Sequence, residues 1–336
     1  MFRPLCCAVA AVSLSVFGTA AATAQERVPG DHMGTFSFTY ENDLLAGTDR
    51  YYTSGFQAAW RSPSADPPGW LAAITGVGAG VVFPDGGTPR WGLAFGQNIF
   101  TPADTQRRNP DPLDRPYAGW LYGAINVASY TAASYGSLEL QLGVVGPSAL
   151  GEEVQNNVHD LINVDRALGW NHQLKDEPGA NLILTRQWRL NSDPVWDDVA
   201  VGIVPTLTGS LGNVQTYASA GIMVRVGNEL EADFGPPRIR PSVSGSAFYQ
   251  PDGRWGWYAF AALDGRAVAR DIFLDGNTWR DSRSVDKEAF VGDASTGVAL
   301  IMPFARLTIT YTARSREFET QRETAQFGSA SLSFRF

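Results

Sequence analysis

Short segments in which apolar and polar side chains alternate recur along most of this chain, and they constrain its fold more than any other feature. Residues 36–41 are an example, because Phe36, Phe38 and Tyr40 alternate with Ser, Thr and Glu. Successive side chains of a β-strand point to opposite faces, so such a segment gathers its apolar residues on one face. The pattern therefore predicts an all-β protein built from amphipathic strands.

The strand-like segments are separated by clusters of Gly, Pro, Asp and Asn. Thirteen segments fit the pattern: 33–43, 53–62, 90–100, 117–130, 136–146, 180–191, 197–209, 214–227, 242–250, 255–269, 287–301, 304–316 and 326–336. A barrel formed by a single bacterial chain has an even number of strands. We omit 242–250, which is short and bounded by Pro241 and Pro251, and predict a twelve-stranded antiparallel β-barrel.

The composition indicates that this barrel crosses a membrane. No segment of 18 or more uninterrupted apolar residues follows the N-terminal region, which excludes a helical membrane protein. The chain is nonetheless 12% aromatic and only 18% charged, with 35 glycines, as expected for strands that face lipid on one side. The formal net charge of −8, without a basic tract, gives no support to a nucleic-acid partner.

The N-terminus has the three parts of a secretory signal. Arg3 precedes a small and apolar run at 5–16, and Ala22-Thr23-Ala24 forms a small-x-small cleavage site. We therefore predict a signal peptide over 1–24 and a mature barrel domain over 25–336. Both cysteines of the chain lie in the signal, so the mature chain has no thiol or disulfide chemistry.

The last strand-like segment indicates the destination of the exported chain. Alternation is strict from Ala330 onward, with Leu332, Phe334 and Phe336 on one face and Ser331, Ser333 and Arg335 on the other. A terminal phenylalanine on an alternating strand resembles the closing strand of bacterial outer-membrane barrels. The predicted location is therefore the outer membrane, with its lipids as surroundings.

One segment, 151–168, follows a helical spacing, with apolar residues at Val154, Val158, Leu161, Ile162 and Leu168. Gln155 and His159 are four residues apart, so they project together from the edge of that apolar stripe. Asp165 would fall within the stripe, where a carboxylate must be paired, bind a metal, or leave the stripe because the helix ends early. His159 is equally compatible with a structural role.

Two further clusters carry polar groups suited to ligands. Asn42 and Asp43 end the first strand and lie near Thr53 on the second, where hard oxygen ligands suit Ca²⁺; an Asn-Asp pair also commonly begins a turn. Arg107 and Arg108 are adjacent in a predicted loop and could bind phosphate, or serve only as counter-ions of the loop.

Together these clusters resemble one family, the outer-membrane lipid A 3′-O-deacylases. The order and spacing of the matching runs agree from the first strand through the helix, whereas the C-terminal half matches only as barrel strands. The matching runs are Glu41-Asn42-Asp43, Tyr52-Thr53-Ser54-Gly55, Gln97 through Pro102, Asp114-Arg115 with Ala118, Gly143 through Pro147, Glu153 through Asn156, and His159.

The resemblance implies that the active site lies between the barrel wall and the inserted helix, at the outer-leaflet end. His159 would be the general base, Asn42 and Asp43 would build the Ca²⁺ and oxyanion region, and Thr53 and Gln155 would support them. Arg107, with Arg108, would face the glucosamine-phosphate head of the substrate. Asp165 stands where the family carries a glutamate, so this possible metal ligand is one methylene shorter.

The implied reaction agrees with the chemistry of these groups. An imidazole base and a hard divalent cation suit hydrolysis of the ester that links the 3′ acyl chain to lipid A of lipopolysaccharide. No Gly-x-Ser-x-Gly motif is present, which favours direct attack by water over an acyl-enzyme. Two alternatives remain open, namely a non-catalytic porin-like or structural barrel, and an outer-membrane phospholipase.

Overall fold

A computed structural model describes residues 28–43, 51–239 and 248–336. The predicted signal peptide, 1–24, lies outside the described residues, and so does most of the omitted segment 242–250. The three residues 248–250 that are described form no strand, in agreement with their omission.

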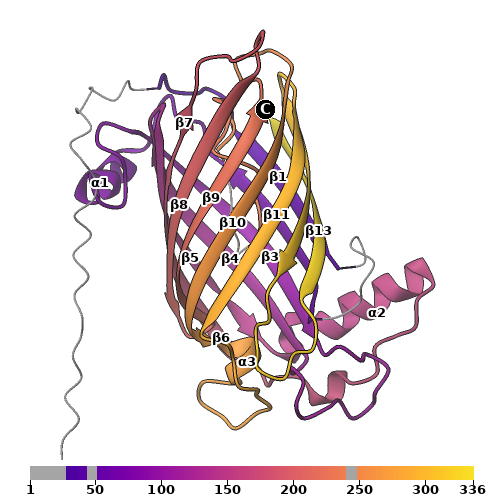
Figure 1. Ribbon diagram of the computed structural model, residues 1–336. Coiled ribbons are helices and arrows are strands. Elements are labelled where there is room, and N and C mark those ends of the chain that lie inside the picture. The colour runs from indigo at the N-terminus through magenta and orange to yellow at the C-terminus, as the bar shows by residue number, and fades with distance from the viewer. Residues whose placement is uncertain (1–27, 44–50, 240–247) are drawn as a thin grey trace, which may run out of the picture.

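The wall is a closed antiparallel barrel of twelve strands (Figure 1), as predicted. Each strand pairs with its neighbours in sequence, and β1 closes on β13. The short β7 continues β6 beyond Arg189 and pairs with the same neighbour, β8, so the two occupy one position in the wall. The strands are β1 Thr35–Asn42, β2 Tyr51–Arg61, β3 Thr88–Thr101, β4 Ala118–Tyr130, β5 Ser134–Val145, β6 Glu177–Trp188, β7 Leu190–Asn191, β8 Ala200–Gly212, β9 Gln215–Gly227, β10 Gly256–Asp271, β11 Phe290–Ile301, β12 Ala305–Arg314 and β13 Ala325–Arg335.

The alternation in the sequence places apolar residues outside and polar residues inside. On β13, Leu332 and Phe334 are 43% and 40% exposed, whereas Ser333 is fully buried. Ser333 Oγ lies 2.7 Å from the hydroxyl of Ser37 on β1, within the lumen. This arrangement is the reverse of a water-soluble barrel and suits a wall surrounded by lipid.

The chain itself fills the lumen from the end where β1 begins and β13 finishes, here called the terminal end. The described parts of the segment 228–255 enter the lumen, where the fully buried Asp233 binds three wall residues. Its carboxylate accepts hydrogen bonds from Arg225 at 2.7 Å, Arg306 at 2.5 Å and Tyr258 at 2.9 Å. Farther along, Arg238 pairs with Glu41 at 2.7 Å.

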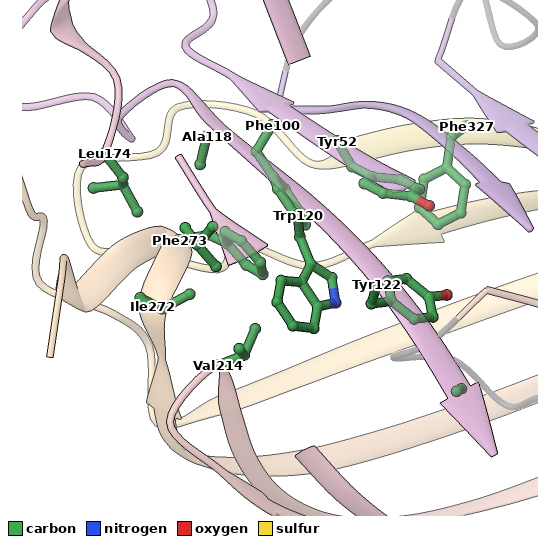
Figure 2. Packing of buried hydrophobic residues seen from close by; sticks show 12 residues of the cluster. Tyr52, Phe100, Ala118, Trp120, Tyr122, Leu174, Val214, Ile272, Phe273 and Phe327 are labelled. Atoms are coloured by element: carbon green, nitrogen blue, oxygen red, sulfur yellow. The ribbon is translucent and has the colours of Figure 1, made fainter. Parts of the chain in front are cut away.

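The opposite end, here called the loop end, is closed by an apolar cluster (Figure 2). The short helix α3, Ile272–Asp275, enters the mouth of the barrel and stacks Phe273 on Phe100 of β3, with ring centroids 4.1 Å apart. Tyr52 and Trp120 belong to the same cluster. Side chains therefore occupy both ends of the barrel interior.

Two longer helices lie outside the wall, at opposite ends of the barrel (Figure 1). α1, Gly69–Val77, lies between two of the predicted strand segments, 53–62 and 90–100, and α2, Gly151–Ile162, lies at the loop end. The remaining helical turns are η2, Pro147–Ala149, and η3, Trp170–His172. None of the helices in the described parts of the chain is long and apolar enough to cross a membrane.

The predicted extent of the inserted helix, 151–168, is wrong at its C-terminal end. α2 stops at Ile162 because Asn163 takes the left-handed conformation, with φ of 59°. Asparagine tolerates this conformation better than most residues, and it is a common helix terminator. Asp165 therefore lies beyond the helix and is exposed, so it does not interrupt an apolar stripe.

Replacement of Asp233 by alanine should strongly destabilise the barrel. The change leaves Arg225 and Arg306 buried without their carboxylate, which costs about 3–5 kcal/mol in comparable buried pairs. Urea unfolding of the protein in lipid vesicles would measure the loss. Asp193→Ala, at an exposed position of the same barrel end, is the matched control. Equal unfolding free energies for the two variants would contradict this role of Asp233.

Candidate active site

A small cavity of about 50 Å³ lies between α2 and the outer faces of β1, β2 and β3. The helix contributes Gln155 and His159, which are both buried and face the wall as their spacing predicted. The cavity is therefore formed by the lipid-facing side of the barrel and lies outside the lumen. Its lining residues are Tyr40, Asn42, Thr53, Ser54, Phe56, Gln97, Val154, Gln155, Val158 and His159.

The wall accepts α2 at short range because of one glycine and one amide. A Cβ at Gly119 of β4 would lie 3.0 Å from the Cβ of Ala149, so the glycine makes room for the start of the helix. Gln97 Nε2 of β3 donates to the carbonyl oxygen of Ala149 at 2.6 Å. Gln97 sits on the outer face, where an amide facing lipid needs a partner, and the helix supplies one.

The face of α2 that meets the wall is polar. It consists of Gly151, Gln155 and His159, at successive i and i+4 positions. The apolar residues that defined the predicted stripe are partly turned outward, and Leu161 and Ile162 are exposed. The helix thus turns Gln155 and His159 toward the wall, while Val154 and Val158 add an apolar part to the cavity lining.

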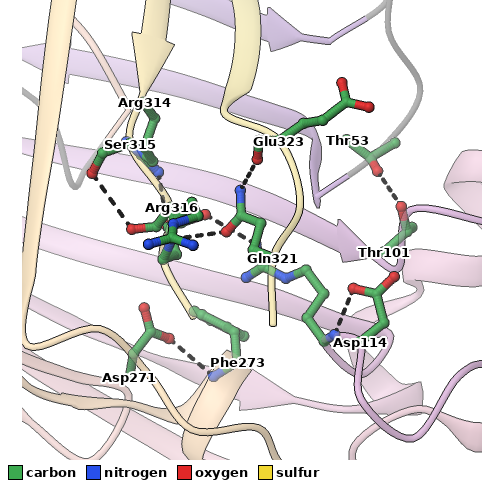
Figure 3. Close-up of polar contacts among 12 residues, drawn as sticks. Thr53, Thr101, Asp114, Asp271, Phe273, Arg314, Ser315, Arg316, Gln321 and Glu323 are labelled. Atoms are coloured by element: carbon green, nitrogen blue, oxygen red, sulfur yellow. Dashed lines mark hydrogen bonds and ion pairs between the residues drawn. The ribbon is translucent and has the colours of Figure 1, made fainter. Parts of the chain in front are cut away.

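Thr53 organises the part of the cavity formed by β1 and β2. The β2–β3 register shifts between Tyr52 and Ser54, so Thr53 is the extra residue of a β-bulge, a feature that redirects side chains. Its hydroxyl lies 2.7 Å from the hydroxyl of Thr101 on β3 (Figure 3). Its carbonyl oxygen accepts hydrogen bonds from Asn42 Nδ2 at 3.0 Å and from the backbone N–H of Asp43 at 3.2 Å.

Gln155 is held by the segment that follows the helix. Its Oε1 accepts a hydrogen bond from Trp170 Nε1 at 2.8 Å, which directs the amide nitrogen elsewhere. That Nε2 atom is buried and has no hydrogen-bond partner among the described residues. A buried donor without a partner is unfavourable, so it is suited to an oxygen atom of a bound molecule.

The orientation of His159 is set by a backbone carbonyl. The side chain is 2% exposed, and its Nδ1 lies 2.7 Å from the carbonyl oxygen of Asp165. A carbonyl oxygen can only accept, so Nδ1 carries the hydrogen and Nε2 of the neutral ring keeps its lone pair. The ring is therefore prepared to accept a proton at Nε2.

The residues that return along α2, 163–168, form a strap that holds this carbonyl in place. Asn156 accepts from the backbone N–H of Ala167 at 2.9 Å. Arg166 forms a bidentate ion pair with Asp160, and this hydrogen bonding lowers the pKa of Asp160. The strap is also fixed to the loop 102–117, because Leu168 N–H donates to the carbonyl of Thr105 at 2.9 Å.

The structure brings together some of the site residues predicted from the sequence and leaves others apart. Asn42, Thr53, Gln155 and His159 line one cavity, and the buried Asp43 is attached to it through Thr53. Asp165, the predicted metal ligand, orients His159 through its backbone carbonyl oxygen. The residue is exposed and does not line the cavity.

The predicted arginines also lie outside the cavity. Arg107 and Arg108 are exposed on the loop 102–117, and Arg107 pairs with Asp111 at 3.4 Å. This loop contacts the strap, so both arginines lie at the same barrel end as the cavity. Within the described residues, no group of three or more His, Cys, Asp and Glu side chains could hold a metal ion.

The family model described as "Outer membrane protein LpxR" matches residues 5–336, nearly the whole chain. This chain belongs to the LpxR family. Its fold is similar to "LpxR from Salmonella typhimurium", with a TM-score of 0.73 and 20% identity over 90% of this chain and 100% of that one. The β domain of the Bordetella autotransporter BrkA is more distant, with a TM-score of 0.42 and 11% identity over 91% and 100% of the two chains. No curated protein sequence matches the chain.

Membership of this family places the chain in the outer membrane. Among the residues that shape the cavity, the polar groups of Gln97, Ser54 and Trp170 were not predicted as site residues. Gln97 and Ser54 could have been found, because both are polar at lipid-facing positions of alternating strands. Trp170 gives no such signal, since only the path of the chain after α2 brings it to Gln155.

Trp170→Phe should loosen α2 without disturbing the barrel. The change removes the donor to Gln155 Oε1, and a buried acceptor left unpaired costs about 1–3 kcal/mol. Hydrogen exchange of the α2 amides should accelerate, while exchange in β8–β11 stays unchanged. Trp196→Phe, at an exposed tryptophan, is the control. Unaltered protection of α2 in Trp170→Phe would show that this hydrogen bond does not hold the helix.

Proposed function

We propose that this chain is a lipid A 3′-O-deacylase, an ester hydrolase that removes the 3′-linked acyl chain from lipid A of lipopolysaccharide. The observation that carries the proposal is the position of His159. It is a buried imidazole with a fixed tautomer, in a cavity that opens on the lipid-facing side of an outer-membrane barrel. A base in that position suits a substrate that resides in the membrane.

The proposed orientation places the loop end, and with it the cavity, at the outer leaflet, where lipopolysaccharide lies. The apolar cavity residues Tyr40, Phe56, Val154 and Val158 suit an acyl chain. Arg107 and Arg108 are exposed at the same end and suit the phosphate of the glucosamine head, since guanidinium groups bind phosphate through paired hydrogen bonds. We also propose that residues 1–24 are a signal peptide removed on export.

In the proposed reaction, Nε2 of His159 takes a proton from water, and the resulting hydroxide attacks the ester carbonyl carbon. The tetrahedral intermediate expels the sugar oxygen, which receives the proton from His159, and a free fatty acid leaves. Gln155 Nε2 supplies a hydrogen bond to the oxyanion, because it is buried and has no other partner among the described residues.

We further propose Ca²⁺ as the cofactor, held by Asn42 and Asp43. Both side chains are buried next to the cavity, and both offer hard oxygen ligands. Asn42 donates its Nδ2 to the carbonyl oxygen of Thr53, and its amide oxygen is a hard ligand of the kind that Ca²⁺ binds. Bound Ca²⁺ would stabilise negative charge on the ester oxygen. The Asp165 carboxylate is not included among the proposed ligands, because it does not line the cavity.

His159→Ala should reduce deacylation of purified lipid A by about 10²- to 10⁴-fold, the usual contribution of a general base. Release of fatty acid from lipid A in detergent micelles would measure the rate. The exposed His172→Ala is the matched control and should retain the wild-type rate. Near wild-type activity of His159→Ala would refute the proposed mechanism.

Asn156→Ala should lower kcat by about 10- to 100-fold with little change in KM, because the strap loses its hold and the Asp165 carbonyl moves away from His159. Nitrogen NMR of the His159 ring should show the Nδ1–H tautomer in the wild type and a mixture in the variant. The neighbouring Asn157→Ala changes an exposed amide of the same helix and serves as control. A uniform loss of protein stability without a change of tautomer would contradict this role of the strap.

Removal of Ca²⁺ by chelation should abolish deacylation. Mg²⁺ should not restore it, because Ca²⁺ accepts more oxygen ligands at longer distances and in a less regular geometry than Mg²⁺ does. Asp43→Asn should raise the free Ca²⁺ concentration needed for half-maximal rate by about tenfold or more, through the loss of one carboxylate. Asp104→Asn, in an exposed loop, is the control. Full activity in the presence of a chelator would exclude the cofactor.

The two alternative functions give different results in simple assays. A porin-like barrel would conduct ions in a planar bilayer, whereas the lumen here is occupied by the segment around Asp233 and by Phe273. A phospholipase would release fatty acids from phosphatidylethanolamine as fast as from lipid A in a mixed-lipid assay. Preference for phospholipid would replace the proposed substrate while leaving the role of His159 in place.

A further inference from the structure

The segment 67–84 contains no charged residue and includes α1 on the outside of the barrel, at the terminal end (Figure 1). We propose that this segment is an interfacial membrane anchor, which inserts into the phospholipid leaflet at the terminal end of the barrel. The proposal depends on the outer-membrane location of the chain and on the orientation proposed above, and it is independent of the proposed enzymatic reaction.

One face of the segment is packed on the lipid-facing wall. Leu71 is fully buried and Phe83 nearly so, and both contact Val127 of β4. A Cβ at Gly136 of β5 would lie 2.0 Å from the carbonyl oxygen of Val82, so the wall is recessed where the chain passes. The segment is thus fixed against the same outer surface that lipid surrounds.

A second face of α1 is apolar and exposed. Trp70, Ile74 and Val77 follow the i, i+4, i+7 spacing of one helical stripe, and they are 44%, 42% and 92% exposed. The exposed Val81 continues the apolar surface beyond the helix. Large apolar side chains on one stripe, beside a wall already surrounded by lipid, are typical of a helix that lies in the membrane interface.

The third face carries only small residues. Ala72 and Gly76 are exposed and lie on the side of the helix away from the Trp70–Val77 stripe, whereas Ala73 lies beside Ile74 and Val77. The first backbone N–H groups of α1 have no side-chain cap, since Pro68 precedes the helix. Such groups need water or lipid head groups, so the helix belongs at the interface rather than in the hydrocarbon.

The exposed stripe continues an aromatic belt of the barrel. The ring of Trp70 lies 6.0 Å from Trp91 of β3, and Trp91 lies 5.1 Å from Trp60 of β2, measured between centroids. Tryptophan is enriched at membrane–water interfaces because its ring is amphipathic. Because the exposed stripe of α1 is continuous with this belt, we infer that phospholipid, and not a second protein, covers the stripe.

The anchor can be located with single nitroxide labels, in a chain whose only cysteines, Cys6 and Cys7, are replaced by serine. Labels would be placed at Val77→Cys on the apolar stripe and at Ala72→Cys on the small face of the same helix. Leu332→Cys on the lipid-facing side of β13 gives the reference for a membrane position. The protein is reconstituted in vesicles of phosphatidylethanolamine and phosphatidylglycerol.

Accessibility to oxygen and to a nickel chelate distinguishes the possible surroundings. At Val77 the ratio of oxygen to nickel accessibility should approach that of Leu332 and exceed that of Ala72 by about threefold or more. Equal ratios at Val77 and Ala72, both typical of water, would overturn the proposal. Exclusion of both reagents at Val77 would also overturn it, because a protein partner would then cover the stripe.

Discussion

The attachment of α2 to the outside of the barrel determines where chemistry can occur in this protein. The lumen is occupied by the chain itself, through the ion pairs of Asp233 and the stacking of Phe273 on Phe100. A site for a lipid must therefore be built on the outer wall, where polar groups have few partners. The hydrogen bond from Gln97 to Ala149 and the space left at Gly119 allow the helix to bring its own polar face to that wall. The cavity exists only because these two surfaces meet.

Within the cavity, most functional groups are oriented by uncharged partners. His159 is held by a carbonyl oxygen, Gln155 by an indole N–H and Asn42 by the carbonyl of Thr53. In a site that faces lipid, neutral hydrogen bonds avoid the large desolvation cost of buried ion pairs. The proposed Ca²⁺ site would add the buried carboxylate of Asp43 to these neutral groups. The charged pair between Asp160 of α2 and Arg166 of the strap lies on the exposed side.

Much of this could be predicted from the sequence, and the failures have physical causes. Alternation predicted the strands because one face of the barrel wall contacts lipid and the other contacts the polar lumen. The i, i+4 spacing correctly placed Gln155 and His159 on one face of α2. The end of α2 was misplaced because apolar spacing continued past Asn163, whose left-handed backbone stops the helix. The metal-ligand role predicted for Asp165 came from its match to a glutamate of the family, whereas in the structure its backbone carbonyl oxygen contacts His159. The contact between Trp170 and Gln155 depends on the path that the chain takes back to α2 after the helix ends. No local sequence pattern predicts that path.

The most direct test of the account is mass spectrometry of lipid A from Gram-negative cells that produce the wild-type chain or His159→Gln at equal levels in the outer membrane. The account predicts that wild-type cells lose the mass of one 3′-linked acyl group from lipid A, and that His159→Gln cells retain the full set of acyl chains. Unmodified lipid A in both strains, with the wild-type protein folded and calcium present, would contradict the assignment of deacylase activity to this outer-wall site.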